Sequence, residues 1–185
     1  MTNTLLSTGG VQGTTNFAQA DKFLLSFSRL PTVTLMCQQA NIPGVMVNSA
    51  TQPTQGVDAP LPGNKFKFED FQITFLIDEN MYAWTTIFDW LQGIGFPDSN
   101  IEYQNLTLQQ KLQLAGTQPQ YSDAMLTYYS NVNSPILQVN FSKVFPVSLG
   151  GIQYDVKQPA TQPMTCTGTF RYTRYQYTRF PSPTL

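Results

Sequence analysis

Residues 63–96 read GNKFKFEDFQITFLIDENMYAWTTIFDWLQGIGF, and the spacing of the apolar residues changes halfway along. In the first half, apolar residues recur at every second position, which is the period of a strand with one buried face. These residues are Phe71, Ile73, Phe75 and Ile77. The period then lengthens to that of an amphipathic helix over residues 80–92. Its predicted core face consists of Met81, Trp84, Ile87, Phe88 and Leu91. The stretch therefore predicts a sheet protein with one helix against a face or flank.

The ends of this predicted helix carry their own signals. Asp78 is placed to cap the helix through its carboxylate, and Glu79 lies near the positive end of the helix dipole. Gly93 and Gly95 are expected to end the helix, with Pro97 just beyond. These two adjacent carboxylates are therefore interpreted as helix-capping groups and not as an acid/base pair.

The same alternation predicts strands in other parts of the chain. The polar residues 97–120 are interpreted as a long excursion from the sheet, either a poor helix or a strand. The phase of the alternation slips near residues 69–70, which predicts a strand break there. A hairpin is expected around the turn at residues 131–135. The predicted strands are residues 21–28, 32–39, 45–49, 71–77, 121–129, 136–145 and 164–178, the last being the longest.

Residues 51–64 contain three prolines and two glycines and are interpreted as an unusually long loop. Because the loop also carries apolar side chains, it is expected to pack against another surface. Two interpretations stay open, a mobile hairpin tip and an inter-subunit loop. The candidate contact residues are Val57, Asp58, Leu61 and Pro62.

The predicted strand at residues 164–178 has an apolar face and a hydroxyl-rich face. The hydroxyl-rich face is expected to meet water, a lumen or a neighbouring subunit. Arginine and tyrosine also interleave over residues 171–180, a pattern typical of single-strand nucleic-acid platforms and of subunit interfaces. The candidate lumen or interface residues are Thr165, Thr167, Thr169, Arg171 and Thr173.

The composition limits the classes of protein to which this chain can belong. The chain has 185 residues, enough for one domain with a real core. Only 11% of the residues are charged, against about 25% in ordinary soluble domains. Low charge with abundant threonine and glutamine favours large subunit interfaces, where each charge would cost desolvation. The formal net charge of −1 is not that of a DNA-binding domain.

The chain contains no histidine, which removes the commonest general base and the commonest metal ligand. Cys37 and Cys166 have no C-x-x-C spacing and are interpreted as buried apolar thiols. No catalytic, cofactor-binding or metal-binding residues are predicted, and an enzyme is not expected. The first ten residues lack the pattern of a signal peptide, and no window is apolar enough to predict a membrane span.

Several short motifs, in order, resemble the tail tube protein of contractile-tailed bacteriophages. Residues 37–44 (CQQANIPG), 62–66 (PGNKF), 68–75 (FEDFQITF), 78–79 (DE) and 88–90 (FDW) are similar to that family. Residues 122–126 (SDAML), 135–139 (PILQV) and 145–149 (FPVSL) continue the resemblance. The resemblance covers roughly residues 21–177.

The expected fold is mainly β, an antiparallel sandwich or partly closed barrel with one flanking helix. The resemblance implies that six copies form a ring with one continuous barrel, and that rings stack into a tail tube. It implies as partners the sheath, the tape-measure protein, baseplate and neck proteins, and viral DNA in transit without sequence readout. The expected location is the virion, after synthesis in the host cytoplasm. Residues 1–20 are expected to form an N-terminal arm. Residues 21–180 are expected to form the tube-like domain, and residues 181–185 a C-terminal tail.

Three alternatives stay open beside the main tube subunit. The long N-terminal arm, the proline-rich tail and the segment after Pro97 favour a specialised ring at the baseplate or neck. The related tube of bacterial type VI secretion systems belongs to the same structural class. A carbohydrate-binding β-sandwich module would be a monomer with exposed aromatic residues.

Overall fold

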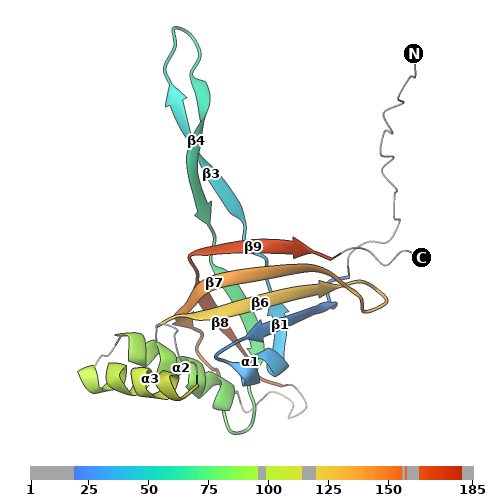
Figure 1. Ribbon diagram of the computed structural model, residues 1–185, viewed down its shortest axis with the longest axis vertical. Helices are drawn as coiled ribbons and strands as arrows, with labels where there is room; N and C mark the ends of the chain where they lie inside the picture. The colour runs from blue at the N-terminus through green and yellow to red at the C-terminus, as the bar shows by residue number, and fades with distance from the viewer. Residues whose placement is uncertain (1–18, 96–98, 114–119, 156, 158–162, 181–185) are drawn as a thin grey trace, which may run out of the picture.

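The computed structural model describes residues 19–95, 99–113, 120–155, 157 and 163–180. Within them the protein is mainly antiparallel β structure, as predicted, with helices gathered at one end (Figure 1). The elements are β1 (Phe23–Phe27), α1 (Pro31–Met36), β2 (Cys37–Ala40), β3 (Val45–Gln52), β4 (Ala59–Phe68), β5 (Phe71–Leu76), α2 (Tyr82–Gly95), α3 (Asn100–Gln113), β6 (Ser122–Tyr129), β7 (Pro135–Leu149), β8 (Thr165–Arg171) and β9 (Arg174–Arg179).

Two antiparallel layers share the fifteen-residue strand β7. The first half of β7 pairs with β6 and β9, and β1 pairs with β6. Its second half pairs with β8, and β8 continues through β5 to β2. Among the described strands, β1, β2 and β9 each pair with one neighbour, so these layers form an open arrangement and not a closed barrel.

The core lies where the two layers face each other. Phe27, Phe71, Phe141 and Phe170 come from β1, β5, β7 and β8, and each is at most 3% exposed. The rings of Phe71 and Phe141 stack with centroids 4.5 Å apart, and those of Phe27 and Phe170 lie 5.2 Å apart. The alternation predicted for β5 is confirmed, because Phe71, Ile73 and Phe75 are all buried.

The strand predicted over residues 32–39 is wrong in its first part, where the structure has the helix α1. Pro31 occupies the first turn, a position at which its fixed φ favours a helix. The Thr34 amide donates to the Leu30 carbonyl at 3.2 Å. Leu30 and Val33 enter the core from this turn. In so short an apolar segment, the periods of strand and helix cannot be told apart.

The single long strand predicted over residues 164–178 is also wrong. The chain bends at Tyr172 and Thr173, leaving β8 in one layer and β9 in the other. The Thr173 amide donates to the Ser142 carbonyl at 3.1 Å, so the bend stays attached to β7. The phase of the alternation changes at the bend, because the interior side chains fall at even positions up to Tyr172 and at the odd position Tyr175 beyond it.

Helix α2 starts near its predicted position, and the Ala83 amide donates to Asp78 Oδ1 at 3.3 Å. It runs to Gly95, so Gly93 does not end it. Gly93 instead lets α3 approach closely, because a Cβ there would lie 3.0 Å from the Leu106 side chain. The segment predicted as a long excursion thus includes the helix α3, which packs on α2 and is followed by β6.

The buried face of α2 differs from the predicted one. Of the predicted set, Ile87 is fully buried, Trp84 and Leu91 pack at the edge of the core, Met81 precedes the helix, and Phe88 is 45% exposed. Ala83, Trp90 and Gly93 complete the buried face. The helix is apolar on two sides, and the side that carries Trp90 faces the body, where the Trp90 ring lies 6.3 Å from that of Phe170.

Candidate assembly surface

Strands β3 and β4 form a two-stranded hairpin, here called the arm, that projects from the body of the protein (Figure 1). The arm replaces the loop predicted over residues 51–64, and only residues 53–58 connect the two strands. Pro60 and Pro62 lie within β4, although proline cannot donate to a sheet ladder. Both are tolerated because an isolated ribbon has a free side on each strand.

The pairing of the arm is interrupted between Val47 and Ser49. Opposite this irregularity, a Cβ on Gly63 would lie 2.0 Å from the Asn48 carbonyl oxygen. Real Cβ atoms do not approach a backbone oxygen so closely, so the irregularity requires glycine at position 63.

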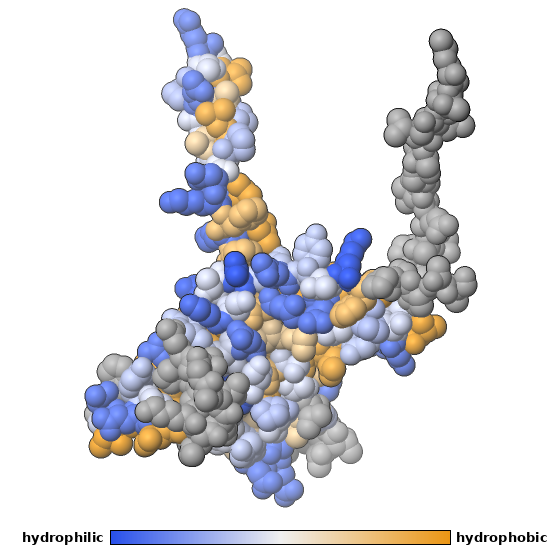
Figure 2. Space-filling model, in the orientation of Figure 1, coloured by the Kyte–Doolittle hydropathy of each residue, from blue (hydrophilic) through white to orange (hydrophobic). Residues whose placement is uncertain are grey.

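The arm exposes apolar side chains along much of its length. Near the base, Val47 pairs with Phe66, and Val45 pairs with Phe68, so the four lie on one face of the ribbon. Val47 is 51% exposed and Phe66 is 69% exposed. Figure 2 shows apolar surface both at the base and near the tip of the arm. Exposed apolar surface of this kind marks a contact with another molecule.

The four predicted loop residues all belong to the outer part of the arm. Val57 and Asp58 lie in the connection, and Leu61 and Pro62 lie in β4. All four are exposed, Val57 most clearly at 77%.

The predicted hydroxyl-rich face is divided by the bend after β8. Thr165 and Thr167 are exposed, and Thr169 is partly exposed. Thr167 is opposite Thr74, and Thr169 lies between Gln72 and Ser148, which extends an uncharged polar surface over three strands. Arg171 ends this surface with an exposed ion pair to Asp70 at 2.9 Å. Thr173 lies beyond, in the bend.

The run of arginine and tyrosine over residues 171–180 does not form one exposed platform. Tyr172 and Tyr175 turn inward, with ring centroids 5.1 and 5.7 Å from that of Phe141. Tyr177 is exposed, as are Arg174 and Arg179 on the outermost strand β9. A single exposed tyrosine does not provide successive stacking positions for bases.

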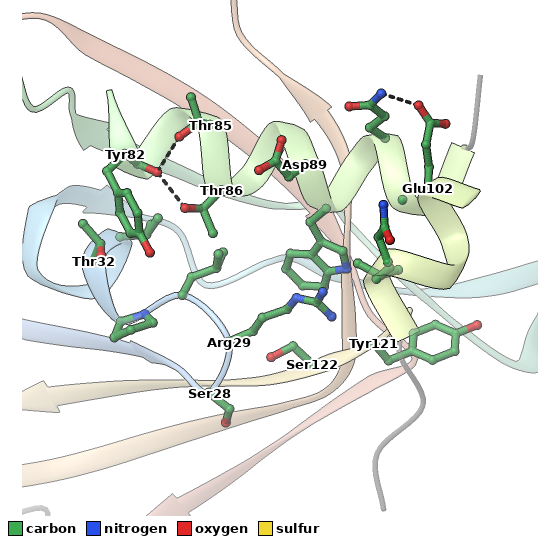
Figure 3. A pocket seen from close by; sticks show the side chains of 18 of the residues that line it. Ser28, Arg29, Thr32, Tyr82, Thr85, Thr86, Asp89, Glu102, Tyr121 and Ser122 are labelled. Carbon is green, nitrogen blue, oxygen red and sulfur yellow. Dashed lines mark hydrogen bonds between the residues drawn. The ribbon is translucent and has the colours of Figure 1, made fainter. Parts of the chain in front are cut away.

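A groove of about 770 Å³ lies between α1, α2 and α3 (Figure 3). The guanidinium of Arg29 points into it, 4.9 Å from the centre of the Trp90 ring, and burial lowers the pKa of Arg29. Glu102 accepts a hydrogen bond from Gln92 on the opposite helix. Sequence reasoning missed this groove because Arg29, Trp90 and Glu102 come from separate segments without a shared motif.

The described residues contain no group of three His, Cys, Asp or Glu side chains placed to hold a metal ion. None of the described helices is long and apolar enough to cross a membrane.

Cys37 and Cys166 are both free thiols in the layer that contains β5. Each is paired in register with Phe75, one on either side of it. Cys166 is buried and Cys37 is partly buried. Burial raises the pKa of Cys37 to about 11. The Cys37 thiol donates to the Gln39 carbonyl.

The raised pKa predicts slow alkylation of Cys37. At pH 8 a thiol of pKa 11 is about 0.1% thiolate, against roughly a quarter for an ordinary thiol of pKa about 8.5. Iodoacetamide should therefore modify Cys37 in the folded protein about 100-fold more slowly than in guanidinium chloride, at a rate that rises with pH toward 11. Peptide mass spectrometry separates Cys37 from Cys166, and equal rates in folded and unfolded protein would contradict the assignment.

Solved structures that share this fold include chains from contractile injection systems. A chain in the extended sheath and tube terminator complex of the PVC extracellular contractile injection system aligns with a TM-score of 0.60, at 12% identity over 88% of this chain and 97% of that one. A chain in the tube-terminating cap of the anti-feeding prophage aligns with a TM-score of 0.58, at 13% identity over 89% and 93%.

The sequence identifies the family. The profile of the family described as phage tail tube protein matches residues 4–178, and this chain belongs to that family. The tail tube terminator protein of Enterobacteria phage T4 is 26% identical over 170 residues, which span 87% of this chain and 89% of that protein. The resemblance stated from the short motifs is therefore confirmed, and the chain has a tube-related structural role in a phage tail.

Proposed function

We propose that this protein forms a six-membered ring at the end of a phage tail tube and terminates the tube. The observation that carries the proposal is the arm, whose apolar side chains remain largely exposed in the protomer. Fully burying one Val, Leu or Phe side chain contributes about 1.5–3 kcal/mol. An arm with several such side chains gains most by lying on a neighbouring copy or on the last ring of the tube.

The open strands support ring formation. Among the described strands, β1, β2 and β9 each have one side without a partner strand. Such edges are satisfied when a neighbouring copy adds its own strand, and a closed ring leaves no edge open. The uncharged surface around Thr167 suits a lumen through which DNA and the tape-measure protein pass, because it offers no cation that would hold phosphates.

The terminator role rests on the relative from phage T4, whose name states that role. The segment after Pro97 also suits a specialised ring, since it forms the additional helix α3 beside α2. The sheath, the neck proteins and the baseplate are the partners expected of such a ring. The main tube subunit is the second candidate, because the family as a whole is described as tail tube protein.

Electron microscopy and light scattering of the purified chain test this proposal. A terminator should form discrete rings that do not elongate by themselves and should bind one end of preformed tail tubes. Long tubes from the pure chain would favour the main tube subunit instead. A protein that stays monomeric at every concentration and binds neither tubes nor copies of itself would show that the proposal is wrong.

A further inference from the structure

The direction in which the arm leaves the body depends on its base alone. All eight residues of β3 are exposed, and most of β4 is exposed as well, so the arm has little packing of its own against the body. A ten-residue strand is about 33 Å long, and a tilt of about 10° at the base would move its tip by roughly 5 Å. The base must therefore be held firmly if the tip is to reach a fixed position on a neighbour.

Two tyrosines hold this base, Tyr172 in the bend after β8 and Tyr175 in β9, and each bonds to one of the two ends of the hairpin. The Tyr172 hydroxyl donates to the carbonyl of Glu69, just after β4, at 3.0 Å. The Tyr175 hydroxyl donates to the carbonyl of Pro43, just before β3, at 3.2 Å. Each strand of the arm is thereby tied to the part of the body where β8 leads into β9.

The hydroxyl of Tyr172 keeps its proton and so remains a hydrogen-bond donor. Burial, with Tyr175, Asp70 and Glu69 nearby, raises the pKa of Tyr172 above its ordinary value. The group therefore remains protonated, and able to donate, throughout the neutral range.

The rings of the two tyrosines also contact the base from the side. The Phe68 ring, at the end of β4, lies 5.8 Å from the Tyr172 ring and 5.4 Å from the Tyr175 ring. Both tyrosines in turn lie against Phe141 in the core. Aromatic contacts at these separations are favourable, and they connect the base of the arm to the interior of the body.

Other contacts at the base act on one strand of the arm or within the base. Before β3, Asn41 ties the chain to β5, because its side-chain oxygen accepts from the Gln72 amide at 2.7 Å. The Glu69 amide donates to the Gly44 carbonyl at 3.1 Å, which joins the two ends of the arm to each other. The ion pair between Arg171 and Asp70 is exposed, and exposed pairs contribute little.

We propose that Tyr172 and Tyr175 are positioning residues for assembly, whose hydroxyl groups set the angle of the arm. The inference rests on the proposed function, in which the arm contacts a neighbouring copy or ring. An arm already held in its binding orientation loses less conformational entropy on contact, which strengthens association without adding an interface residue.

The test removes the hydroxyls and keeps the rings, in the variant Tyr172→Phe/Tyr175→Phe. Spin labels at Asp58→Cys in the arm and Thr178→Cys on β9, with Cys37 and Cys166 replaced by alanine, report the distance between arm and body in the monomer. We expect a broader distance distribution than in the parent, and a concentration threshold for ring formation raised by at least about tenfold. The melting temperature checks that the body remains folded.

The matched control is Tyr82→Phe/Tyr154→Phe, which makes the same chemical change at tyrosines that are 60% and 71% exposed and lie outside the arm and the edge strands. It should leave both readouts unchanged. An unchanged distance distribution would show that the hydroxyls do not hold the arm, and a broader one with an unchanged threshold would show that its angle does not matter for assembly. If the parent itself forms no rings, the proposed function fails, and the distances alone still report whether the tyrosines hold the arm.

Discussion

Replacing residues 48–65 by the dipeptide Asn-Gly is expected to abolish ring assembly and to leave a folded protomer. The replacement joins Val47 to Phe66, which are directly opposite in the arm, through a two-residue turn of a favoured type. It removes the outer arm with Val57 and Leu61. Because none of the removed residues belongs to the buried core, the free energy of unfolding should change by less than about 1 kcal/mol.

The loss of assembly should be large. Val57 and Leu61 each contribute about 1.5–3 kcal/mol if they are fully buried on a neighbour, so the threshold should rise at least about 100-fold. Analytical ultracentrifugation over a concentration series measures this threshold. Rings formed by the shortened chain at the parent concentration would show that the outer arm has no role in assembly.

A matched pair of single substitutions tests the same point without shortening the chain. Val57 in the arm and Val132 in the turn before β7 are 77% and 78% exposed. Val57→Ser should weaken assembly and Val132→Ser should not, although both remove an equally exposed apolar side chain.

The body of the fold was predictable where burial imposes a clear period on the sequence. Strand β5 has one face in the core, so its alternation is strict, and the change of period after it marks α2 correctly. The hairpin of β6 and β7 was predicted for the same reason, with its turn at residues 131–135. In each case the apolar pattern is required by the core and not by a partner outside the protomer.

The strand predicted at residues 45–49 is confirmed as the first part of β3. The outer part of the arm was not predictable as strands, because nothing in the protomer buries either of its faces. Its proline and glycine content, which is typical of loops, is compatible with a ribbon that is paired on one side only. The bend at Tyr172 was missed because the shift of phase from Tyr172 to Tyr175 was not interpreted as a strand break. The two inward tyrosines were grouped with an exposed basic run, since sequence alone does not show which side of a bend faces the core.

The second large effect is expected from Phe71→Ala, in the core between the two layers. Phe71 is fully buried and lies within 6.4 Å, between ring centroids, of Phe27, Phe141 and Phe170. Removing such a ring leaves a cavity that the surrounding strands cannot fill, at a cost of about 3–5 kcal/mol in the free energy of unfolding. For a chain of this size the melting temperature should fall by roughly 6–20 °C. Urea unfolding of the monomer measures the loss, and a change below about 1 kcal/mol would contradict this view of the core.

Phe66→Ala is the matched control, because it makes the same chemical change at a phenylalanine that is 69% exposed on the arm. It should alter the free energy of unfolding by less than about 1 kcal/mol, since little packing is lost within the protomer. It should nevertheless raise the threshold for ring assembly, an effect that Phe71→Ala should not have in protein that remains folded. Opposite effects of the two substitutions would separate the residues that fold the protomer from those that join it to its neighbours. If Phe66→Ala instead destabilised the protomer as strongly as Phe71→Ala, the arm would be part of the folded core and not a surface for assembly.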